Sequence, residues 1–296
     1  MSATNIAIEW DKTGEHYYET GVDRGVLYKM KNDGTYENGE GWNGITSVDE
    51  SPSGAEAEKI YADNAVYLNL LSAEDFGGTV NAYTYPDGFK ECNGEANLGG
   101  APGVVVGQQE RKSFGFAYRT KKGNEANPDL GYLIHLWYGC KASPSDKSYS
   151  TVNDSPEAIE FSWEVTTTPV EVGAVNGINY KKTALITVDS TQFEAKGNTT
   201  DNAEKGNLAY LNAFEQYLYG SKVGEAEYAP VSITGESLPS GFEYYTKSGS
   251  TYSVATEYAA NTQYYVKVQN AVATATPAKF PTPEQVFKLL TTGSPT

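Results

Sequence analysis

Three segments between residues 107 and 169 alternate apolar or aromatic residues with polar ones. The segments run from Gly107 to Thr120, from Gly131 to Tyr138, and from Ser162 to Pro169. The apolar residues spaced two apart are Phe114, Phe116, Tyr118, Tyr132, Ile134, Leu136 and Tyr138. A period of two places side chains on one face of an extended strand, which is typical of a half-buried sheet. The segments therefore predict a sheet, and no catalytic constellation accompanies them.

The composition also favours sheets. The chain has 23 Tyr and 10 Phe against 2 Met and 2 Cys, and its 30 Gly and 13 Pro suit tight turns. With 296 residues, it can form one large β domain or a main domain of about 200 residues with an appendage. We expect a mainly β fold, a β-sandwich or barrel.

The formal net charge of -16 argues against binding nucleic acid through its phosphates, because such binding depends on Lys and Arg. The first residues lack the basic flank and apolar run of a signal peptide, and no window reaches the roughly 18 apolar residues of a membrane span. We therefore expect a protein that is made and kept in a cytoplasm, with no membrane partner.

One flanking α-helix is predicted over residues 207–219, where Gly220 ends the pattern. Its apolar residues recur at three- and four-residue steps, namely Leu208, Leu211, Phe214, Leu218 and Tyr219. Further strands are predicted at 59–71 and 78–85, and residues 277–290 read as an extended stretch leading into a short helix. Residues 31–58 read as a long loop or irregular hairpin with few apolar anchors.

Residues 224–271 differ in character from the rest, and we name them the inserted module. Tyr244-Tyr-Thr-Lys247 recurs there as Tyr264-Tyr-Val-Lys267, with turn-forming residues between strand-like runs. We expect a small β module inserted into a main domain that consists of residues 1–223 and 272–296. Tyr244, Tyr245, Tyr264 and Tyr265 are candidate glycan-facing aromatics, although paired tyrosines on adjacent strands are more often sheet packing.

Sites for catalysis, cofactors or metals are not predicted. Gly39-Glu-Gly41-Trp-Asn-Gly44 has dinucleotide-fingerprint spacing, but it neither follows an apolar strand nor opens a helix. His16 and His135 are the only histidines, and no Cys or His pair has metal-ligand spacing. Cys92 and Cys140 are expected to be small apolar residues, not a disulfide. Abundant carboxylates leave a glycosidase as a minor alternative, but none sits in a setting that would raise its pKa.

Many short motifs, kept in order, resemble the major tail protein, or tail-tube protein, of long-tailed, non-contractile phages of Gram-positive gut bacteria. They are Tyr18-Glu-Thr-Gly-Val-Asp23, Gly25-Val-Leu-Tyr28, Trp42-Asn-Gly44, Glu50-Ser-Pro-Ser-Gly-Ala-Glu56, Tyr61-Ala-Asp-Asn64, Tyr67-Leu-Asn69, Phe76-Gly-Gly-Thr79, Tyr83-Thr-Tyr-Pro-Asp87, Gln109-Glu-Arg-Lys-Ser-Phe114, Tyr118-Arg-Thr120, Pro144-Ser145, Ser162-Trp163 and Thr167-Thr-Pro169. The resemblance covers about residues 17–220 and the final segment. The inserted module departs from the simplest family members and looks like an exterior decoration.

The resemblance implies a structural subunit and not an enzyme. Six copies would form a ring whose strands close an inner barrel, and rings would stack into a tube for DNA ejection. Implied partners are further copies of the chain and the tape measure, tail terminator and distal tail proteins. DNA would pass through the lumen without specific binding, and no cofactor is implied. The implied location is the virion tail, assembled in the bacterial host cytoplasm. A carbohydrate-binding or adhesin β protein is the alternative.

Subunit or ring contacts are expected where the chain buries little by itself: the N-terminal arm, residues 31–58 and the C-terminal segment. The candidate residues are Trp10, Trp42, Ile45, Val48, Pro281 and Phe287. The acidic balance suggests a lumen without strong positive charge, because such a wall would hold passing phosphates.

Overall fold

The computed structural model describes residues 10, 12–54, 56–99, 101, 103–149, 151, 158–175, 177–197 and 205–296. Strands make up 44% of the chain and helices 11%, which confirms the mainly β class, and the sheets are open and not closed into a barrel. No helix in the described ranges is long and apolar enough to cross a membrane.

The largest sheet has eight strands, in the order β2-β1-β11-β12-β13-β8-β3 with β16 also paired to β12, and we name the part made of β2, β1, β11, β12 and β16 the long sheet. The strands are β1 (Tyr17–Lys29), β2 (Glu40–Trp42), β11 (Phe114–Asn124), β12 (Gly131–Ala142) and β16 (Leu185–Asp189). All of these pairings are antiparallel. The strands predicted around Phe114 and Tyr132 are thus confirmed as the two central strands of the molecule.

The end of β12 continues into a second layer, the short sheet, whose order is β12-β13-β8-β3. Its other strands are β3 (Ile45–Glu50), β8 (Gly77–Ala82) and β13 (Phe161–Thr166). Gly139 lies where β12 passes from one sheet to the other. The position requires glycine, because its φ of +58° is left-handed and a Cβ there would lie 2.4 Å from the Thr168 carbonyl oxygen. The pairing of β11 with β12 shifts register on either side of this glycine.

An aromatic core fills the space between the two sheets. Trp42, Phe89, Phe116, Trp137 and Trp163 are buried there. Trp42 contacts Phe89, Phe116 and Trp163 at ring distances of 4.5 to 5.6 Å. Phe89 and Cys92 come from the short helix α1 (Phe89–Cys92), and Cys140 reaches the same core from β12. Both cysteines are buried free thiols, and burial raises the pKa of Cys92 to about 12.

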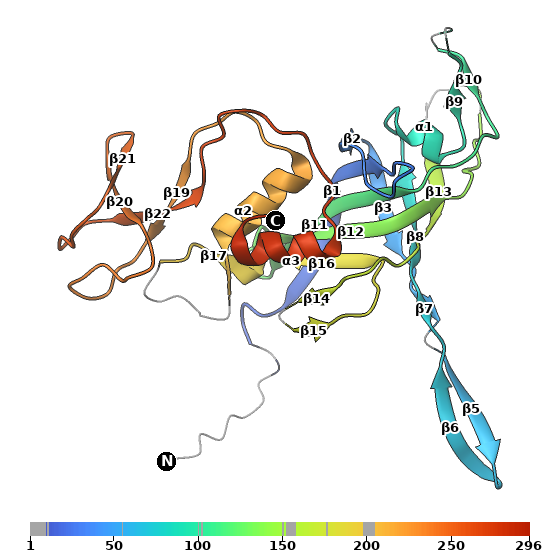
Figure 1. Ribbon diagram of the computed structural model, residues 1–296, viewed down its shortest axis with the longest axis horizontal. Helices are drawn as coiled ribbons and strands as arrows, with labels where there is room; N and C mark the ends of the chain where they lie inside the picture. The colour runs from blue at the N-terminus through green and yellow to red at the C-terminus, as the bar shows by residue number, and fades with distance from the viewer. Residues whose placement is uncertain are drawn as a thin grey trace.

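Two helices cover the opposite face of the long sheet (Figure 1). The predicted helix is confirmed as α2 (Leu208–Tyr219), capped by Asn207, and the predicted C-terminal helix as α3 (Pro283–Thr292), which begins with a capping box at Thr282. Leu211, Phe214 and Leu218 of α2 and Val286 and Leu289 of α3 join Ile134, Leu136 and Tyr138 in one cluster.

The expectation of a half-buried sheet was wrong for β12. Every residue from Ile134 to Cys140 is buried, because the aromatic core covers one face and the helices cover the other. Trp137 occupies the opposite phase of the alternation from Ile134 and Leu136, and both phases are covered.

Several short elements project from this body. The strand predicted over 59–71 is a hairpin of β5 (Ala57–Ala62) and β6 (Ala65–Leu71), because Asp63 and Asn64 take positive φ angles of 53° and 61° and turn the chain. The segment at 31–58, predicted as a long loop or irregular hairpin, holds β2, β3, β4 (Ser53–Gly54) and the start of β5. The remaining short elements are β7 (Glu74–Asp75), β9 (Ala96–Asn97), β10 (Val105–Val106), β14 (Ala174–Val175), β15 (Ile178–Asn179), η1 (Ser190–Gln192), β17 (Phe193–Glu194) and β18 (Gly206–Asn207).

The inserted module forms its own sheet, in the order β19-β22-β20-β21, at the left of Figure 1. Its strands are β19 (Glu227–Val231), β20 (Tyr244–Ser248), β21 (Thr251–Val254) and β22 (Tyr264–Gln269). Val231, Tyr244, Tyr264, Val266 and Val268 make its core. The chain enters and leaves at one point, since Gly224 and Val272 exchange two backbone hydrogen bonds. The division into two domains stays a prediction.

Candidate assembly surfaces

The outer face of the short sheet is polar and uncovered. Strand alternation explains this, because Trp163 and Val165 of β13 and Val80 of β8 point into the aromatic core and their neighbours point outward. Pairing aligns the outward side chains in two rows, Ser47–Asn81–Ser162 and Asp49–Thr79–Glu164. The Asn81 amide donates to Ser47 Oγ at 2.8 Å. None of the three strands β3, β8 and β13 contains Lys, Arg or His.

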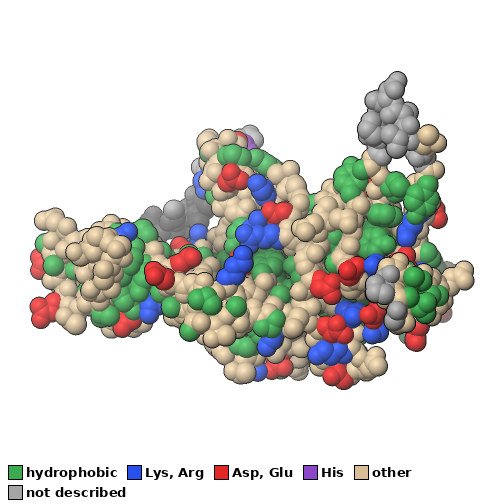
Figure 2. All heavy atoms as spheres, turned by 90° about the horizontal axis from the view of Figure 1, so that it is seen from above, with side chains coloured by type: hydrophobic (Ala, Val, Ile, Leu, Met, Phe, Trp, Pro, Cys, Tyr) green, Lys and Arg blue, Asp and Glu red, His purple; other side chains and the backbone are tan. Residues whose placement is uncertain are grey.

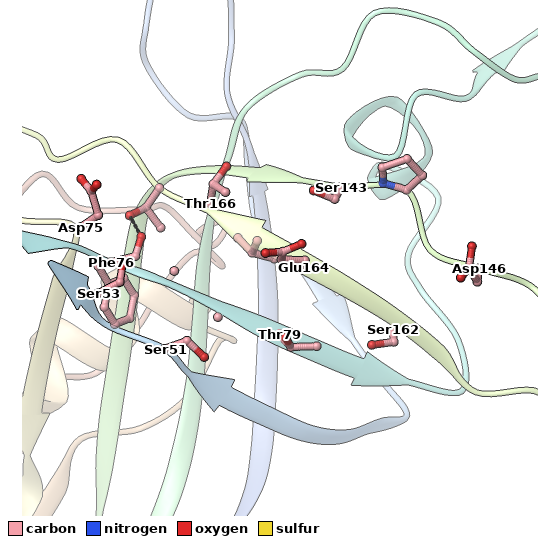
Figure 3. A pocket seen from close by; sticks show the side chains of 15 residues that line it. Ser51, Ser53, Asp75, Phe76, Thr79, Ser143, Asp146, Ser162, Glu164 and Thr166 are labelled. Carbon is pink, nitrogen blue, oxygen red and sulfur yellow. Dashed lines mark hydrogen bonds between the residues drawn. The ribbon is translucent and has the colours of Figure 1, made fainter.

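A groove of about 730 Å³ lies on this face. Figure 3 shows Thr79, Ser162, Glu164 and Thr166 on the strands, with Asp75 and Asp146 toward opposite ends of the groove. Its ionisable groups are the carboxylates of Asp75, Asp146 and Glu164, beside hydroxyls. The lining therefore has acceptors and negative charge, and among its described residues no imidazole, thiol or ammonium to act as base, nucleophile or cation. Across the described ranges, no three His, Cys, Asp or Glu residues are grouped to hold a metal.

The two sheets are connected at one end by the carboxylate of Glu50, the last residue of β3. Tyr118 Oη donates to Glu50 at 2.6 Å, and His135 Nδ1 lies 3.4 Å from the same oxygen. The His135 contact lowers the pKa of Glu50 despite partial burial, and the Tyr118 hydrogen bond adds to this effect. Burial and the bond to Glu50 raise the pKa of Tyr118. His135 therefore lies within a structural cluster, and its ring stacks on Tyr118 at 4.6 Å.

Two of the candidate contact residues, Trp10 and Phe287, lie toward opposite ends of the chain. Trp10 is 80% exposed, and Phe287 is half-buried and stacked on Tyr180. Trp42 is only 3% exposed and donates its indole N–H to the Thr84 carbonyl, so it packs within its own subunit. The other candidates pack similarly: Ile45 and Val48 are partly buried against the aromatic core, and Pro281 is buried. Their role in subunit contacts stays a prediction.

Of the four candidate glycan-facing tyrosines, Tyr244 and Tyr264 form the core of the inserted module, and Tyr245 is also buried. Tyr265 is half-buried on the opposite face of the module's sheet, and sequence reasoning missed its neighbours there. Tyr228 stacks on Tyr252 at 4.0 Å, and Tyr252 contacts Tyr265 at 5.2 Å. The glycan-facing role stays a prediction. Because Tyr244 and Tyr264 are buried in the module core, this prediction now concerns only the second face of the sheet, which carries Tyr265.

No protein-family model matches the sequence, and no curated protein matches it. Among solved structures, the SPP1 tail tube is similar at 10% identity, covers 61% of this chain and 89% of its own, and has a TM-score of 0.32. The anti-feeding prophage baseplate is similar at 8% identity, covers 56% of this chain and 92% of its own, and has a TM-score of 0.27. These TM-scores are too low to support an argument, and the mainly β class rests on the strands themselves.

Proposed function

We propose that this protein is the structural subunit of a phage tail tube. Six copies form a ring, and stacked rings form the channel through which DNA is ejected. In the virion tail, the tube adjoins the tape measure, tail terminator and distal tail proteins, and it is assembled in the bacterial host cytoplasm. The ordered sequence motifs from Tyr18 to Pro169 suggest this role, and one structural observation carries it further.

That observation is the uncovered polar face of the short sheet. Around its central strands β11 and β12 the long sheet is packed on both faces, whereas the short sheet presents a broad open strand face that suits a channel wall. Its rows of Ser, Asn, Thr, Asp and Glu side chains carry no positive charge on β3, β8 or β13. Phosphate binding depends on Lys and Arg, so this wall lets DNA pass without holding it. Asp49 and Glu164 are then lumen residues.

The short sheet is also suited to closing a ring. Among the described strands, β3 pairs with β8 alone, which leaves its other edge free. The four strands alternate in direction, so β3 runs opposite to β12. A rotational repeat therefore brings β3 of one copy beside the end of β12 and residues 143–147 of the next in an antiparallel sense. Closing the sheets into one barrel removes the exposed edges.

Negative-stain electron microscopy of the purified protein over a range of concentrations tests the proposal. Uniform tubes or six-fold rings are the expected result. Dispersed monomers under every condition would contradict it.

Carbohydrate binding is the second candidate function, favoured by the accessible cluster of Tyr228, Tyr252 and Tyr265. Lys247 lies 5.2 Å from the centre of the Tyr252 ring, so a cation accompanies the aromatic surface. Aromatic rings of this kind stack on sugars and also simply pack on each other. A glycan-binding screen of the full chain, repeated with the Tyr265→Ala and Tyr252→Ala variants, distinguishes sugar binding by these rings from packing of the rings on each other. If the unaltered chain binds a glycan and each substitution abolishes this binding, the carbohydrate-binding function is supported. If the unaltered chain binds no glycan, this function is rejected.

A further inference from the structure

The second face of the inserted module's sheet, opposite the module core, gathers four tyrosines and two lysines. Directly paired residues share one face of a sheet. The three pairs on this face are Tyr228–Lys267, Tyr265–Tyr245 and Lys247–Tyr252. We name these six residues the tyrosine–lysine face. Figure 2 shows hydrophobic side chains on the surface of the module, at the left of the view, with Lys or Arg side chains near them.

The tyrosine rings of this face form one continuous cluster. Tyr228 contacts Tyr252 at a ring distance of 4.0 Å and Tyr245 at 4.8 Å, and Tyr252 contacts Tyr265 at 5.2 Å. Tyr228, Tyr252 and Tyr265 are half-buried, so part of each ring stays accessible, whereas Tyr245 is buried. An accessible aromatic surface that also carries hydroxyls suits a sugar ring, which has an apolar face and hydroxyls of its own.

The positive charge of the module lies entirely on this face. Residues 224–271 contain five Glu and no Asp, Arg or His, and their two lysines are Lys247 and Lys267. Lys247 Nζ lies 5.2 Å from the centre of the Tyr252 ring, and Lys267 Nζ lies 5.3 Å from the centre of the Tyr245 ring. In a chain whose net charge is -16, this local arrangement favours a ligand that carries negative charge close to a ring.

A cavity of about 180 Å³ opens beside the tyrosine–lysine face. Tyr245 and Lys267 line it from the module, and Lys196 lines it from the segment after β17. The Glu243 carboxylate also lies in the cavity and accepts a hydrogen bond from the Tyr245 hydroxyl, and the Glu194 carboxylate lies 3.9 Å from Lys196 Nζ. Pockets that enclose a whole small molecule measure roughly 300 to 1,000 Å³, so this cavity suits one substituent of a larger ligand.

We propose that the tyrosine–lysine face binds an acidic saccharide, one whose sugar rings carry carboxylate groups. This inference rests on the carbohydrate-binding function proposed above. The accessible tyrosines hold the sugar rings, Lys247 and Lys267 attract the carboxylates, and the cavity beside Lys196 receives one of them. An ammonium group is a point charge that imposes no bidentate geometry, so binding depends on the charge of the saccharide more than on one exact linkage.

A matched pair of ligands tests the preference for charge. Oligogalacturonate and its methyl ester have the same sugar rings, but the ester lacks the carboxylate charges. In isothermal titration calorimetry with the full chain, we expect the acid to bind and the ester to bind about tenfold more weakly. Binding of the acid should weaken as salt rises, because salt screens charges at a protein surface.

Substitution of the lysines supplies the second test. Lys247→Gln combined with Lys267→Gln is expected to weaken binding of the acid about tenfold and to leave binding of the ester unchanged. Both side chains lie outside the module core, so folding is preserved. Lys181→Gln combined with Lys182→Gln removes the same charge from exposed positions outside the module and should change neither affinity. Tyr265→Ala should weaken both ligands, because it removes a ring from the cluster.

The outcomes separate the acidic preference from carbohydrate binding itself. Equal affinity for the acid and the ester, or an unchanged affinity of the double Lys247 and Lys267 variant, overturns the preference and leaves carbohydrate binding standing. Binding of a neutral glycan without binding of oligogalacturonate has the same meaning. If no saccharide binds, the carbohydrate-binding function falls as well. Single-stranded nucleic acid also combines charge with stacking rings. Tighter binding of a single-stranded oligodeoxynucleotide of equal charge would therefore assign the face to nucleic acid and overturn the proposal.

Discussion

Tyr118 and Glu50 connect the two layers of the sandwich through a hydrogen bond of 2.6 Å, which the tyrosine hydroxyl donates. Tyr118 belongs to a central strand of the long sheet, and Glu50 ends the edge strand of the short sheet. Trp137 Nε1 lies 3.4 Å from the same carboxylate oxygen. The edge strand is therefore held both by its backbone pairing with β8 and by one side chain that reaches across the core.

Tyr118→Phe removes this bond and leaves a partly buried carboxylate with fewer donors. We expect the free energy of unfolding to fall by about 1 to 2 kcal/mol, as measured by urea denaturation. Tyr67→Phe, on the exposed hairpin, is the matched control and should change nothing measurable. Equal stability of the two variants would show that the bond contributes little.

Glu50 should also make stability depend on pH. Its pKa in the folded protein is lowered from the ordinary value of 4.5, so the ionised carboxylate stabilises the fold above that value and this contribution is lost as pH falls through the folded pKa. Glu50→Gln should flatten the loss of stability below about pH 4.5 in urea denaturation at a series of pH values. Glu58→Gln on the hairpin serves as control, and a profile unchanged by Glu50→Gln would refute the assignment.

The charge of the short sheet's outer face should decide whether assembled tubes retain DNA. Asp49→Lys combined with Glu164→Lys is expected to make tubes bind short duplex DNA at low salt, with binding lost as salt rises. Tubes of the unaltered protein should bind little. Glu225→Lys combined with Glu236→Lys, in the inserted module, applies the same charge change elsewhere and should have a much smaller effect in a filter-binding assay. Equal binding by both double variants would place Asp49 and Glu164 outside the lumen.

The inserted module should be removable. Gly224 and Val272 lie side by side through two backbone hydrogen bonds, so a two-residue Asn-Gly turn can replace residues 225–271 without moving the flanking chain. Leu208 and Asn212 of α2 contact the module and become more exposed, which should lower the melting temperature modestly. The shortened protein is expected to keep its β circular dichroism spectrum and its assembly in micrographs. Loss of folding would show that residues 224–271 belong to the main domain.

Sequence periodicity was sufficient to predict β8, β11, β12, β13 and α2, because each of these elements has a clear two-residue or helical repeat. Periodicity did not predict whether one or both faces of a strand are covered by other layers of the fold. Trp137 occupies the phase opposite to Ile134 and Leu136, and only the arrangement of both layers shows that all three are buried. The turn at Asp63 and Asn64 was missed because apolar residues continue on both sides of it.

The surfaces were harder to predict than the elements. Tyr245 and Tyr265 occupy the same position in two related motifs and pair directly across two strands, yet Tyr245 is buried and Tyr265 is half-buried. The outward rows of the short sheet depend on the pairing of three strands that are far apart in sequence. Alternation within a strand shows which residues share a face, but the rest of the fold decides which face remains open.

The long sheet, packed between an aromatic core and two helices, has a mechanical consequence. A sheet held on both sides resists flexing, because any curvature disturbs one of the two packed layers. The projecting hairpins have no such support. In a filament of these subunits, bending strain would therefore concentrate at the joints between bodies, and each body would behave as a stiff segment.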